Sequence, residues 1–533
     1  MTTLPTARRR GAAVPDDVRP VRVTGPRVAR LLDEVEGADA PRRTALADAF
    51  WNEVEERGTP LVEALDGRPG HRAVTFLWRG HRATRRVLLS ANRLTDRDRL
   101  AGSLLERVPG TDVWHLGLRL RADHRGSYRL AADLSPKEPA SGPDGLQQRL
   151  RSLTAHAAAD PRGRLSVPAR WRPAGSSVFA LPGAPPQPWA GRRGHVPAGH
   201  VERHRVAGAA PVGDRDVWVY LPPGPDRTGA PLPVAVMCDG DMWFGRMGFG
   251  DTLDALIADG ALPPLVVVAP DAVDRRTRWR DLGGREPFVA FLADELLPWA
   301  AGRWPLTTDP RRTVVAGQSL GGVTALYAAL LRPERFGNVL AQSASLWWRP
   351  GLPAPAGAKP AVYGTPWLAG RYASAPARPV TVHLDVGLHE GVTVDHHRAL
   401  YDVLRSTGHR ATYDTYNGGH DHACWHGALA DGLVRLLHGT TTPTDPRTTP
   451  ASTHTAAPTT PATPAAPAAP AGSRASPSAS RAWEVPPGRH GWARRHPANA
   501  GQRDPPPPST NTGTPRNPPG PAPARPVSPL SPP

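Results

Sequence analysis

Between residues 193 and 440, short apolar runs alternate with longer runs in which apolar residues recur at helical spacing. The segment 262–273 is apolar almost without a break, as expected of a strand buried on both faces of a sheet. Strands that alternate with helices in this way predict an α/β domain with a mostly parallel sheet. The expected strands are 216–223, 232–240, 262–273, 313–316, 336–345, 380–387 and 411–417, and the expected helices are 286–300, 323–332 and 395–408.

The N-terminal part of the chain has a different pattern. Residues 26–57 have helical spacing, whereas the runs between about 70 and 135 alternate aromatic or β-branched residues with polar ones. This alternation is typical of half-buried strands and predicts a small all-β sandwich. We therefore expect an N-terminal domain over 25–175, a linker over 176–192 and the α/β domain over 193–440.

Proline is concentrated near the C-terminus. From residue 441 to 533, Pro, Thr, Ser and Ala dominate, and such a composition cannot bury enough apolar surface to offset the entropy of ordering. We expect a disordered tail over 441–533 and a disordered N-terminus over 1–24.

The net charge of +17 comes almost entirely from arginine, because Lys137 and Lys359 are the two lysines among 533 residues. An arginine excess is explained either by GC-rich codon usage or by an anionic partner. No nucleic-acid-binding module and no basic stripe with interleaved aromatic residues is present, so we expect no nucleic-acid partner.

The cysteine count and the hydropathy indicate the compartment. Two cysteines, Cys238 and Cys424, are too few for a disulfide scaffold and suit a reducing environment. The first residues lack the apolar run of a signal peptide, and no segment reaches the roughly 18 apolar residues of a membrane helix. We expect a cytoplasmic protein without a membrane partner, either a monomer or a weak oligomer.

One motif carries candidate chemistry. Gly317-Gln318-Ser319-Leu320-Gly321 reads G-x-S-x-G and lies between an expected strand and an expected helix. In an α/β-hydrolase fold this context places the serine on a sharp turn at the C-terminal edge of the sheet. We therefore expect Ser319 to be a nucleophile and the backbone N–H of Leu320 to be an oxyanion donor.

A serine nucleophile needs a base, and the base needs an acid that orients it. His420 follows the last expected strand and would reach the same sheet edge as Ser319. Two acids follow the strand before it: Asp385 within the strand end and Glu390 in the loop beyond. We prefer Glu390, because a loop residue can turn back across the sheet edge.

Two further features surround this expected triad. His422, Cys424 and His426 alternate with His420, which would suit a metal site in an extended loop, but no second cluster supplies more ligands and we expect no metal or other cofactor. A second oxyanion donor is expected among the backbone N–H groups after Gly240, beginning with Asp241.

These motifs together resemble the bacterial enterochelin (ferric enterobactin) esterase family, over about residues 45 to 440. The N-terminal domain contributes "FWNEVEERGTPLVE", "VTFLWRG", "VPGTDVWHLGLRLRADHRGSYRL" and "LTAHAAADPRGR". The α/β domain contributes "RDVWVYLPPG", "DGDMWF", "PRRTVVAGQSLGG", "RPERFGNVLAQSASLWW" and "GGHDHACWHGAL", of which the last two are the most distinctive.

The resemblance implies hydrolysis of the ester backbone of a ferric tris-catecholate siderophore. It implies Ser319 as nucleophile, His420 as base and Glu390 as acid. It also implies that Arg278 binds substrate, although Asp281 stands where the family commonly has glutamate; the alternative is an ion pair between Arg278 and Asp281.

The expected substrate is anionic and aromatic, so arginines would attract it and tryptophans could stack on its rings. The candidates for stacking are Trp243, Trp347 and Trp348, each of which could instead be a core residue. Two other functions stay open: another ester hydrolase or acyltransferase of the same fold, such as one acting on feruloyl-type esters, and a catalytically inactive siderophore-binding protein.

Overall fold

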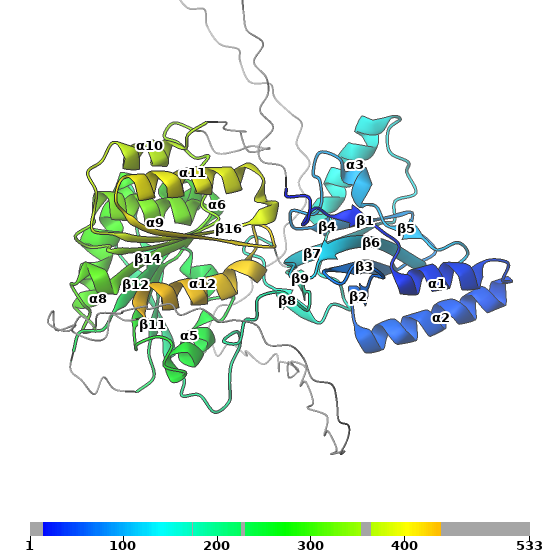
Figure 1. The fold of residues 1–533 in the computed structure, drawn as a ribbon, viewed down its shortest axis with the longest axis horizontal. Coiled ribbons are helices and arrows are strands. Elements are labelled where there is room, and N and C mark those ends of the chain that lie inside the picture. Colours follow the sequence, from blue (N-terminus) through cyan, green and yellow to red (C-terminus); the bar gives the residue numbers. More distant parts are fainter. Residues whose placement is uncertain (1–13, 173, 225–229, 353–363, 439–533) are drawn as a thin grey trace, which may run out of the picture. The chain divides into compact units, whose positions relative to one another are not determined.

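The computed structural model describes residues 14–172, 174–224, 230–352 and 364–438 (Figure 1). The expected tail over 441–533 and residues 1–13 of the expected disordered N-terminus lie outside the described residues.

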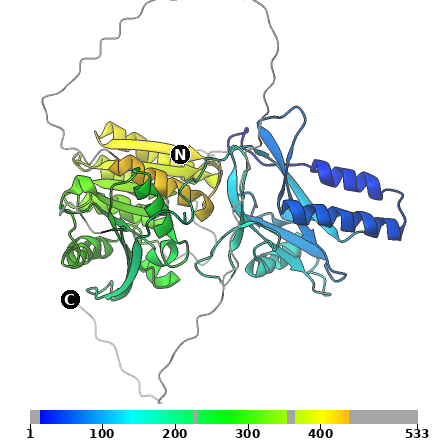
Figure 2. The same cartoon turned by 90° about the horizontal axis from the view of Figure 1, so that it is seen from below.

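The N-terminal domain contains the predicted helices and two antiparallel sheets. The helices α1 (Pro26–Val35) and α2 (Ala40–Arg57) lie side by side and share an apolar core (Figure 2). Asp39 caps α2 by accepting a hydrogen bond from the backbone N–H of Arg42. Between the sheets, alternate residues of the facing strands form a second core, as the alternation predicted.

One sheet has the order β1-β6-β3-β2, with β5 paired to β6, and the other has the order β4-β7-β9-β8. The strands are β1 (Val21–Arg22), β2 (Leu61–Ala64), β3 (His71–Arg79), β4 (Arg86–Ala91), β5 (Glu106–Arg107), β6 (Val113–Arg121), β7 (Arg125–Asp133), β8 (Leu165–Val167) and β9 (Ser176–Ala180), and the helices α3 (Pro143–His156) and η1 (Leu100–Ser103, a 3₁₀ turn) complete the domain.

Both expected boundaries of this domain need correction. Val21 and Arg22 pair with β6, so ordered structure begins before residue 25. Ser176–Ala180 pairs with β7 and β8, so the domain continues past 175 into the stretch expected to be linker. The segment Ser176–Ala180 has little strand pattern of its own. It forms a strand because it pairs with β7, which is far away in sequence.

The α/β domain is built on an eight-stranded sheet with the order β10-β11-β13-β12-β14-β15-β16-β17. In this sheet, β13, β12, β14, β15, β16 and β17 are parallel to one another. At one edge, β11 is antiparallel to both of its neighbours, β10 and β13. The predicted mostly parallel sheet is therefore confirmed. The strands are β10 (His200–Val206), β11 (Arg215–Leu221), β12 (Val234–Met237), β13 (Val266–Pro270), β14 (Thr313–Gln318), β15 (Asn338–Gln342), β16 (Thr381–Gly387) and β17 (Arg410–Tyr416).

Helices cover both faces of this sheet (Figure 1). The helices α7 to α11 share one core with the sheet, and α5 and α12 share the other. The helical elements are α4 (Gly240–Trp243), α5 (Phe249–Ala258), α6 (Arg275–Asp281), α7 (Glu286–Ala290), η2 (Phe291–Leu296), α8 (Leu297–Ala301), η3 (Pro310–Arg312), α9 (Leu320–Leu331), α10 (Trp367–Ala373), η4 (Leu388–Glu390), α11 (Val392–Ser406) and α12 (His422–Leu437).

The expected helix over 286–300 forms, with a π-helical segment, η2, between α7 and α8. Pro298 lies just after this segment and lacks the N–H that a regular α-helical turn would use. Among the elements that sequence patterning missed are the strands β9 and β10 and the helices α3, α5, α6, α10 and α12.

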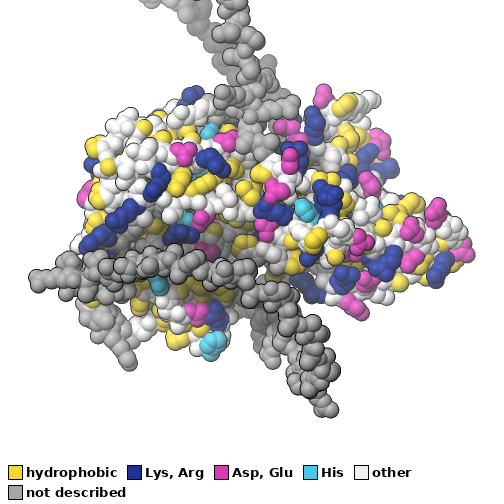
Figure 3. All heavy atoms as spheres, in the orientation of Figure 1, with side chains coloured by type: hydrophobic (Ala, Val, Ile, Leu, Met, Phe, Trp, Pro, Cys, Tyr) yellow, Lys and Arg dark blue, Asp and Glu magenta, His cyan; other side chains and the backbone are white. Residues whose placement is uncertain are grey.

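Within the described ranges, no helix is long and apolar enough to cross a membrane. On the face shown in Figure 3, Lys and Arg side chains lie among Asp and Glu side chains and do not form one continuous stripe.

Candidate active site

Ser319 lies on a strained turn between β14 and α9. Its backbone has φ 60° and ψ −118°, a conformation that non-glycine residues rarely adopt. A Cβ atom on Gly317 would lie 2.3 Å from the backbone of Gly321, so the first glycine of the motif is required by the close approach of strand and helix. The motif therefore predicted the turn correctly, and the structure gives the steric reason.

The Ser319 hydroxyl is partly exposed and lies 3.0 Å from the hydroxyl of Ser345. The Ser319 N–H donates to the Gln342 carbonyl, and the Ser345 N–H donates to the Ser319 carbonyl. The turn is therefore held by the end of the neighbouring strand β15. Leu320 is the first residue of α9, so its N–H belongs to a helix N-terminus, where backbone donors favour negative charge.

The other expected members of the site also follow strand ends. Glu390 ends the 3₁₀ turn η4 after β16, and His420 follows β17. Because β14, β16 and β17 are parallel, their C-terminal ends share one edge of the sheet with Ser319.

The structure brings Glu390 and His420 together. The distance between His420 Nδ1 and Glu390 Oε2 is 2.6 Å, and the Glu390 side chain is fully buried, with a relative exposure of 0%. Burial alone would raise the pKa of Glu390, but His420, Arg93 and the Ser343 hydroxyl outweigh it and lower this pKa to about 2. Glu390 is therefore a carboxylate at neutral pH and can fix the imidazole with Nδ1 as the protonated nitrogen.

Glu390 Oε1 accepts two further hydrogen bonds, from the Ser343 hydroxyl at 2.5 Å and from the Gly387 N–H at 3.1 Å. Ser343 in turn accepts from the Trp425 indole N–H, and the His420 ring packs edge-on against the same indole at 4.7 Å. Ser343 was not expected from sequence. The sequence feature that could have indicated Ser343 is its position directly after β15. This strand lies between β14, which precedes Ser319, and β16, which precedes Glu390.

Asp385 occupies a different place. Its Oδ2 accepts a hydrogen bond from the Gln342 side-chain amide at 3.0 Å. Gln342 Oε1 accepts from Gln318, and Gln318 Oε1 accepts from the Trp243 indole N–H, so a buried chain of polar groups crosses the sheet beneath the serine turn. Burial raises the pKa of Asp385 well above its ordinary value. The structure thus joins His420 to Glu390 and joins Asp385 to Gln342.

On the opposite side of Ser319, the loop after β12 contains a buried aspartate. Asp239 has φ 69° and accepts hydrogen bonds from Arg170 at 2.7 Å and from both Arg278 Nε and Arg278 Nη2, each at 2.7 Å. Burial would raise the pKa of Asp239, and the two arginines hold it below its ordinary value. These ion pairs hold Asp239 in place, and Asp241 lies two residues further along the chain.

Asp241 lies in α4 and presents its carboxylate to the Ala272 N–H at 3.2 Å and to Arg170 Nε at 3.3 Å. Arg170 comes from the N-terminal domain and no sequence pattern indicated it.

The alternative partner considered for Arg278 is wrong. The Asp281 carboxylate pairs with Arg215 at 2.6 Å and with Arg280 at 2.6 Å, whereas Arg278 pairs with Asp239 and lies 3.5 Å from the Gln318 carbonyl. Arg278 therefore lies against the backbone of Gln318, the residue that precedes Ser319.

Two tryptophans expected to stack on a ligand are core residues. Trp243 has 0% exposure and lies against Phe249 and His422, and Trp348 has 1% exposure and lies against Trp367 and Arg285. Their ring faces are covered, which corrects the expectation of stacking. Trp347 is also buried and stacks on Trp279 at 6.1 Å.

Three of the four residues considered as metal ligands lie within one helix. His422 begins α12, so the alternation with Cys424 and His426 does not run along an extended loop, as assumed from sequence. Cys424 Sγ contacts the Arg125 carbonyl at 3.3 Å, and His426 Nε2 lies 2.9 Å from the Thr252 hydroxyl. In the part of the chain that the structure describes, no three His, Cys, Asp or Glu residues are grouped to hold a metal ion.

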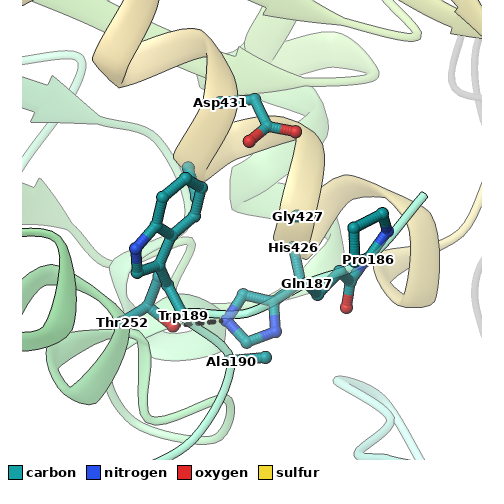
Figure 4. Close-up of a pocket in the computed structure, with 9 residues that line it drawn as sticks. Pro186, Gln187, Trp189, Ala190, Thr252, His426, Gly427 and Asp431 are labelled. Atoms are coloured by element: carbon teal, nitrogen blue, oxygen red, sulfur yellow. Dashed lines mark hydrogen bonds between the residues drawn. The ribbon is translucent and has the colours of Figure 1, made fainter. Parts of the chain in front are cut away.

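A small pocket lies beside α12. Figure 4 shows Trp189 and His426 on its walls, with the hydrogen bond between His426 and Thr252. Ser319, Glu390 and His420 do not line it, so it is separate from the candidate site.

Taken together, the geometry supplies a serine on a strained turn, a buried carboxylate bonded to a histidine, and a helix N-terminus. This set of groups suits nucleophilic acyl transfer, in which a serine attacks a carbonyl and a histidine moves the proton.

Comparisons with known proteins agree with this chemistry. Residues 208–436 match the Esterase family, and residues 73–190 match the family "Enterochelin esterase, N-terminal". The chain is 35% identical to an iron(III) salmochelin esterase of Escherichia coli, over 73% of this chain and 93% of that protein. It is 36% identical to an iron(III) enterobactin esterase of Dickeya dadantii, over 74% of this chain and 93% of that protein.

Solved structures give the same result. The enterobactin esterase of Shigella flexneri, determined in the presence of enterobactin, is 30% identical with a TM-score of 0.62, over 73% of this chain and 97% of that one. The ferric enterobactin esterase of Salmonella typhimurium has the same identity and TM-score, over 73% of this chain and 98% of that one.

Proposed function

The chain belongs to the enterochelin esterase family, and on this premise we propose that it hydrolyses the ester bonds of iron(III)-loaded catecholate siderophores through Ser319, His420 and Glu390. The observation that carries the substrate class is that relatives named iron(III) salmochelin and iron(III) enterobactin esterases match over 93% of their own length. The similarity to these relatives therefore covers both domains and is not limited to the hydrolase domain.

In the first half of the reaction, the Ser319 oxygen attacks the ester carbonyl and His420 takes the hydroxyl proton. The C–O bond to the leaving alcohol then breaks, and His420 returns the proton to that oxygen. An acyl-enzyme on Ser319 and a free alcohol are formed. Water, activated by His420, attacks the acyl-enzyme and releases the acid, so atoms and charge balance over the cycle.

Glu390 holds His420 in one tautomer and stabilises the imidazolium that forms during each proton transfer. Its low pKa supports this role, because a carboxylate that stays ionised at neutral pH can stabilise that positive charge.

The negative charge on the carbonyl oxygen requires donors. We assign these to the N–H of Leu320, at the start of α9, and to an N–H beside Asp241. In other serine hydrolases the loss of one such donor costs about 2.7–4 kcal/mol of transition-state stabilisation.

Two arginines lie close to the serine turn. Arg278 and Arg170 meet at Asp239, Arg278 lies 3.5 Å from the Gln318 carbonyl, and the carboxylate of Asp241 also faces Arg170. The iron(III) ion belongs to the substrate, and the ester cleavage itself uses no metal.

The decisive experiment is to incubate the full chain with a ferric tris-catecholate trilactone and to identify the products by mass. We expect successive addition of water to the ester backbone, and no reaction with Ser319→Ala. Turnover of feruloyl-type esters alone would overturn the siderophore assignment. Transfer of the acyl group to an added alcohol in place of water would indicate an acyltransferase, and binding without labelling by a fluorophosphonate would indicate an inactive binding protein.

We further propose that the reaction takes place in the cytoplasm and that the protein acts as a monomer or weak oligomer. The two cysteines, Cys238 and Cys424, are both unpaired and buried, which suits a reducing compartment. Cell fractionation and light scattering test the two statements separately.

A further inference from the structure

The loop that carries His420 is contacted by the N-terminal domain. The side-chain amide of Asn92, just after β4, donates to the His420 carbonyl at 2.9 Å. A Cβ atom on Gly419 would lie 2.7 Å from Asn92 Oδ1 and 2.6 Å from Arg93 Cγ. The two domains therefore touch at the residue next to His420, with no room for a side chain on Gly419.

The same surface holds the loop at two further points. The Arg125 N–H donates to the Asn417 carbonyl at 3.1 Å, and the Ser127 N–H donates to Asp421 Oδ2 at 2.7 Å. Asp421 also caps α12 through the Ala423 N–H at 3.1 Å. Each end of the segment 417–421 is thus bonded to β7.

Arg93 reaches the acid of the site. Its Nη2 lies 3.9 Å from Glu390 Oε2, the same oxygen that contacts His420 Nδ1. The Arg93 side chain is 34% exposed, whereas Glu390 is fully enclosed. A buried carboxylate is costly without a positive charge nearby. Arg93 provides a permanent one, while His420 is positive only when protonated.

The backbone of Arg93 is unusual as well. Its φ is 59°, in the left-handed region that favours glycine and asparagine. An arginine that served only to make this turn would be replaceable by either residue without loss.

We propose that Asn92 and Arg93 of the N-terminal domain are positioning residues for the acid–base pair of the hydrolase domain. Asn92 holds the backbone of His420, and Arg93 keeps Glu390 ionised and directed toward His420. Neither touches the reacting atoms. This inference rests on the proposed roles of Glu390 and His420.

The test compares Arg93→Asn, which keeps the left-handed backbone and removes the charge, with Arg93→Lys, which keeps the charge. Arg68→Asn, at an exposed arginine of the same domain, is the matched control. We expect Arg93→Asn to lower kcat about tenfold to a hundredfold, less than the loss of an acid–base group itself, with KM changed less than about twofold. We expect Arg93→Lys to recover most of kcat.

Two outcomes would overturn the proposal. If Arg93→Asn matched wild type and Arg68→Asn, the guanidinium would have no role in positioning. If KM rose while kcat stayed constant, Arg93 would be binding substrate directly. Melting temperature and circular dichroism of each variant show whether a loss of kcat comes from unfolding.

Each variant is assayed with a ferric tris-catecholate trilactone and with a p-nitrophenyl ester, and the rate of labelling by a fluorophosphonate is measured. A wild-type protein that cleaves the aryl ester and leaves the siderophore intact would overturn the proposed substrate. The effect of Arg93 would still be read from the aryl ester and from labelling of the serine, so the two failures are distinguishable.

Discussion

The two sides of the candidate site are built in different ways. The serine side consists of consecutive residues, since β14, the turn at Ser319 and α9 follow one another and the motif glycines make the contact. The histidine side joins Glu390, His420, Ser343 and Arg93, which come from four separate segments and from both domains. The first can be recognised in a short stretch of sequence, whereas the second depends on contacts between segments that are far apart in the chain.

The largest effect expected is on the serine side. Ser319→Ala removes the proposed nucleophile and should lower kcat by about five to six orders of magnitude, as in other serine hydrolases, while leaving the fold intact. Hydrolysis assays together with a melting curve check both statements. Residual turnover within tenfold of wild type would show that another group attacks the ester.

The next effect separates the two acids on the histidine side. Glu390→Gln should lower kcat by about four orders of magnitude with little change in KM, because the glutamine cannot stabilise the imidazolium. Asp385→Asn should leave kcat nearly unchanged, since Asp385 is bonded to Gln342. Steady-state kinetics of both variants decide the matter: the reverse pattern would make Asp385 the acid, and no effect from either would indicate a Ser319–His420 dyad.

A smaller loss is expected from the contact between the domains. Asn92→Ala removes the donor to the His420 carbonyl and should lower kcat about threefold to tenfold, the effect of one lost neutral hydrogen bond. Single-turnover kinetics show whether the chemical step is slowed. An unchanged chemical step would mean that the bonds from β7 are sufficient to place the loop.

The last prediction concerns stability instead of rate, and the two acids should give opposite pH dependences. Glu390 has its pKa lowered from 4.5 to about 2 on folding, so its stabilisation is present above pH 4.5 and is lost as the pH falls toward 2. Asp385 has a pKa raised well above 3.8, so ionisation of this group opposes folding increasingly as the pH rises past 3.8.

Urea unfolding across this range compares wild type with each variant. The destabilisation caused by Glu390→Gln should shrink as the pH falls from 4.5 to 2. The free energy of unfolding of Asp385→Asn should increase relative to that of wild type as the pH rises. Parallel curves for wild type and both variants would mean that neither carboxyl changes its proton affinity on folding.

The sheet, the serine turn and the residues expected at the same edge of the sheet could be predicted from sequence, because they depend on local pattern and on strand order. The argument that a loop residue can turn back across the sheet edge favours Glu390 over Asp385, and in the structure Glu390 lies beside His420. The tryptophans show what local pattern cannot predict, because an indole in a loop can face either solvent or the core. Trp243 can be buried because the side-chain oxygen of Gln318 accepts a hydrogen bond from its indole N–H.

Asn92, Arg93 and Arg170 could not be predicted, because their partners lie in the other domain. Asn92 and His420 are 328 residues apart, and no periodicity or spacing rule extends over such a distance. The strand β9 and the helix α12 were missed for a related reason, since tertiary neighbours override weak local preferences.

The ion cluster at Asp239 has a consequence for how such proteins can diversify. Its carboxylate belongs to the hydrolase domain, and one of its two arginines, Arg170, belongs to the N-terminal domain. A hydrolase domain transferred to another gene by itself would carry a buried carboxylate that has lost one of its cations. Recombination between relatives should therefore retain Arg170 and Asp239 as a matched pair, and the two domains should pass from ancestor to descendant as one heritable unit.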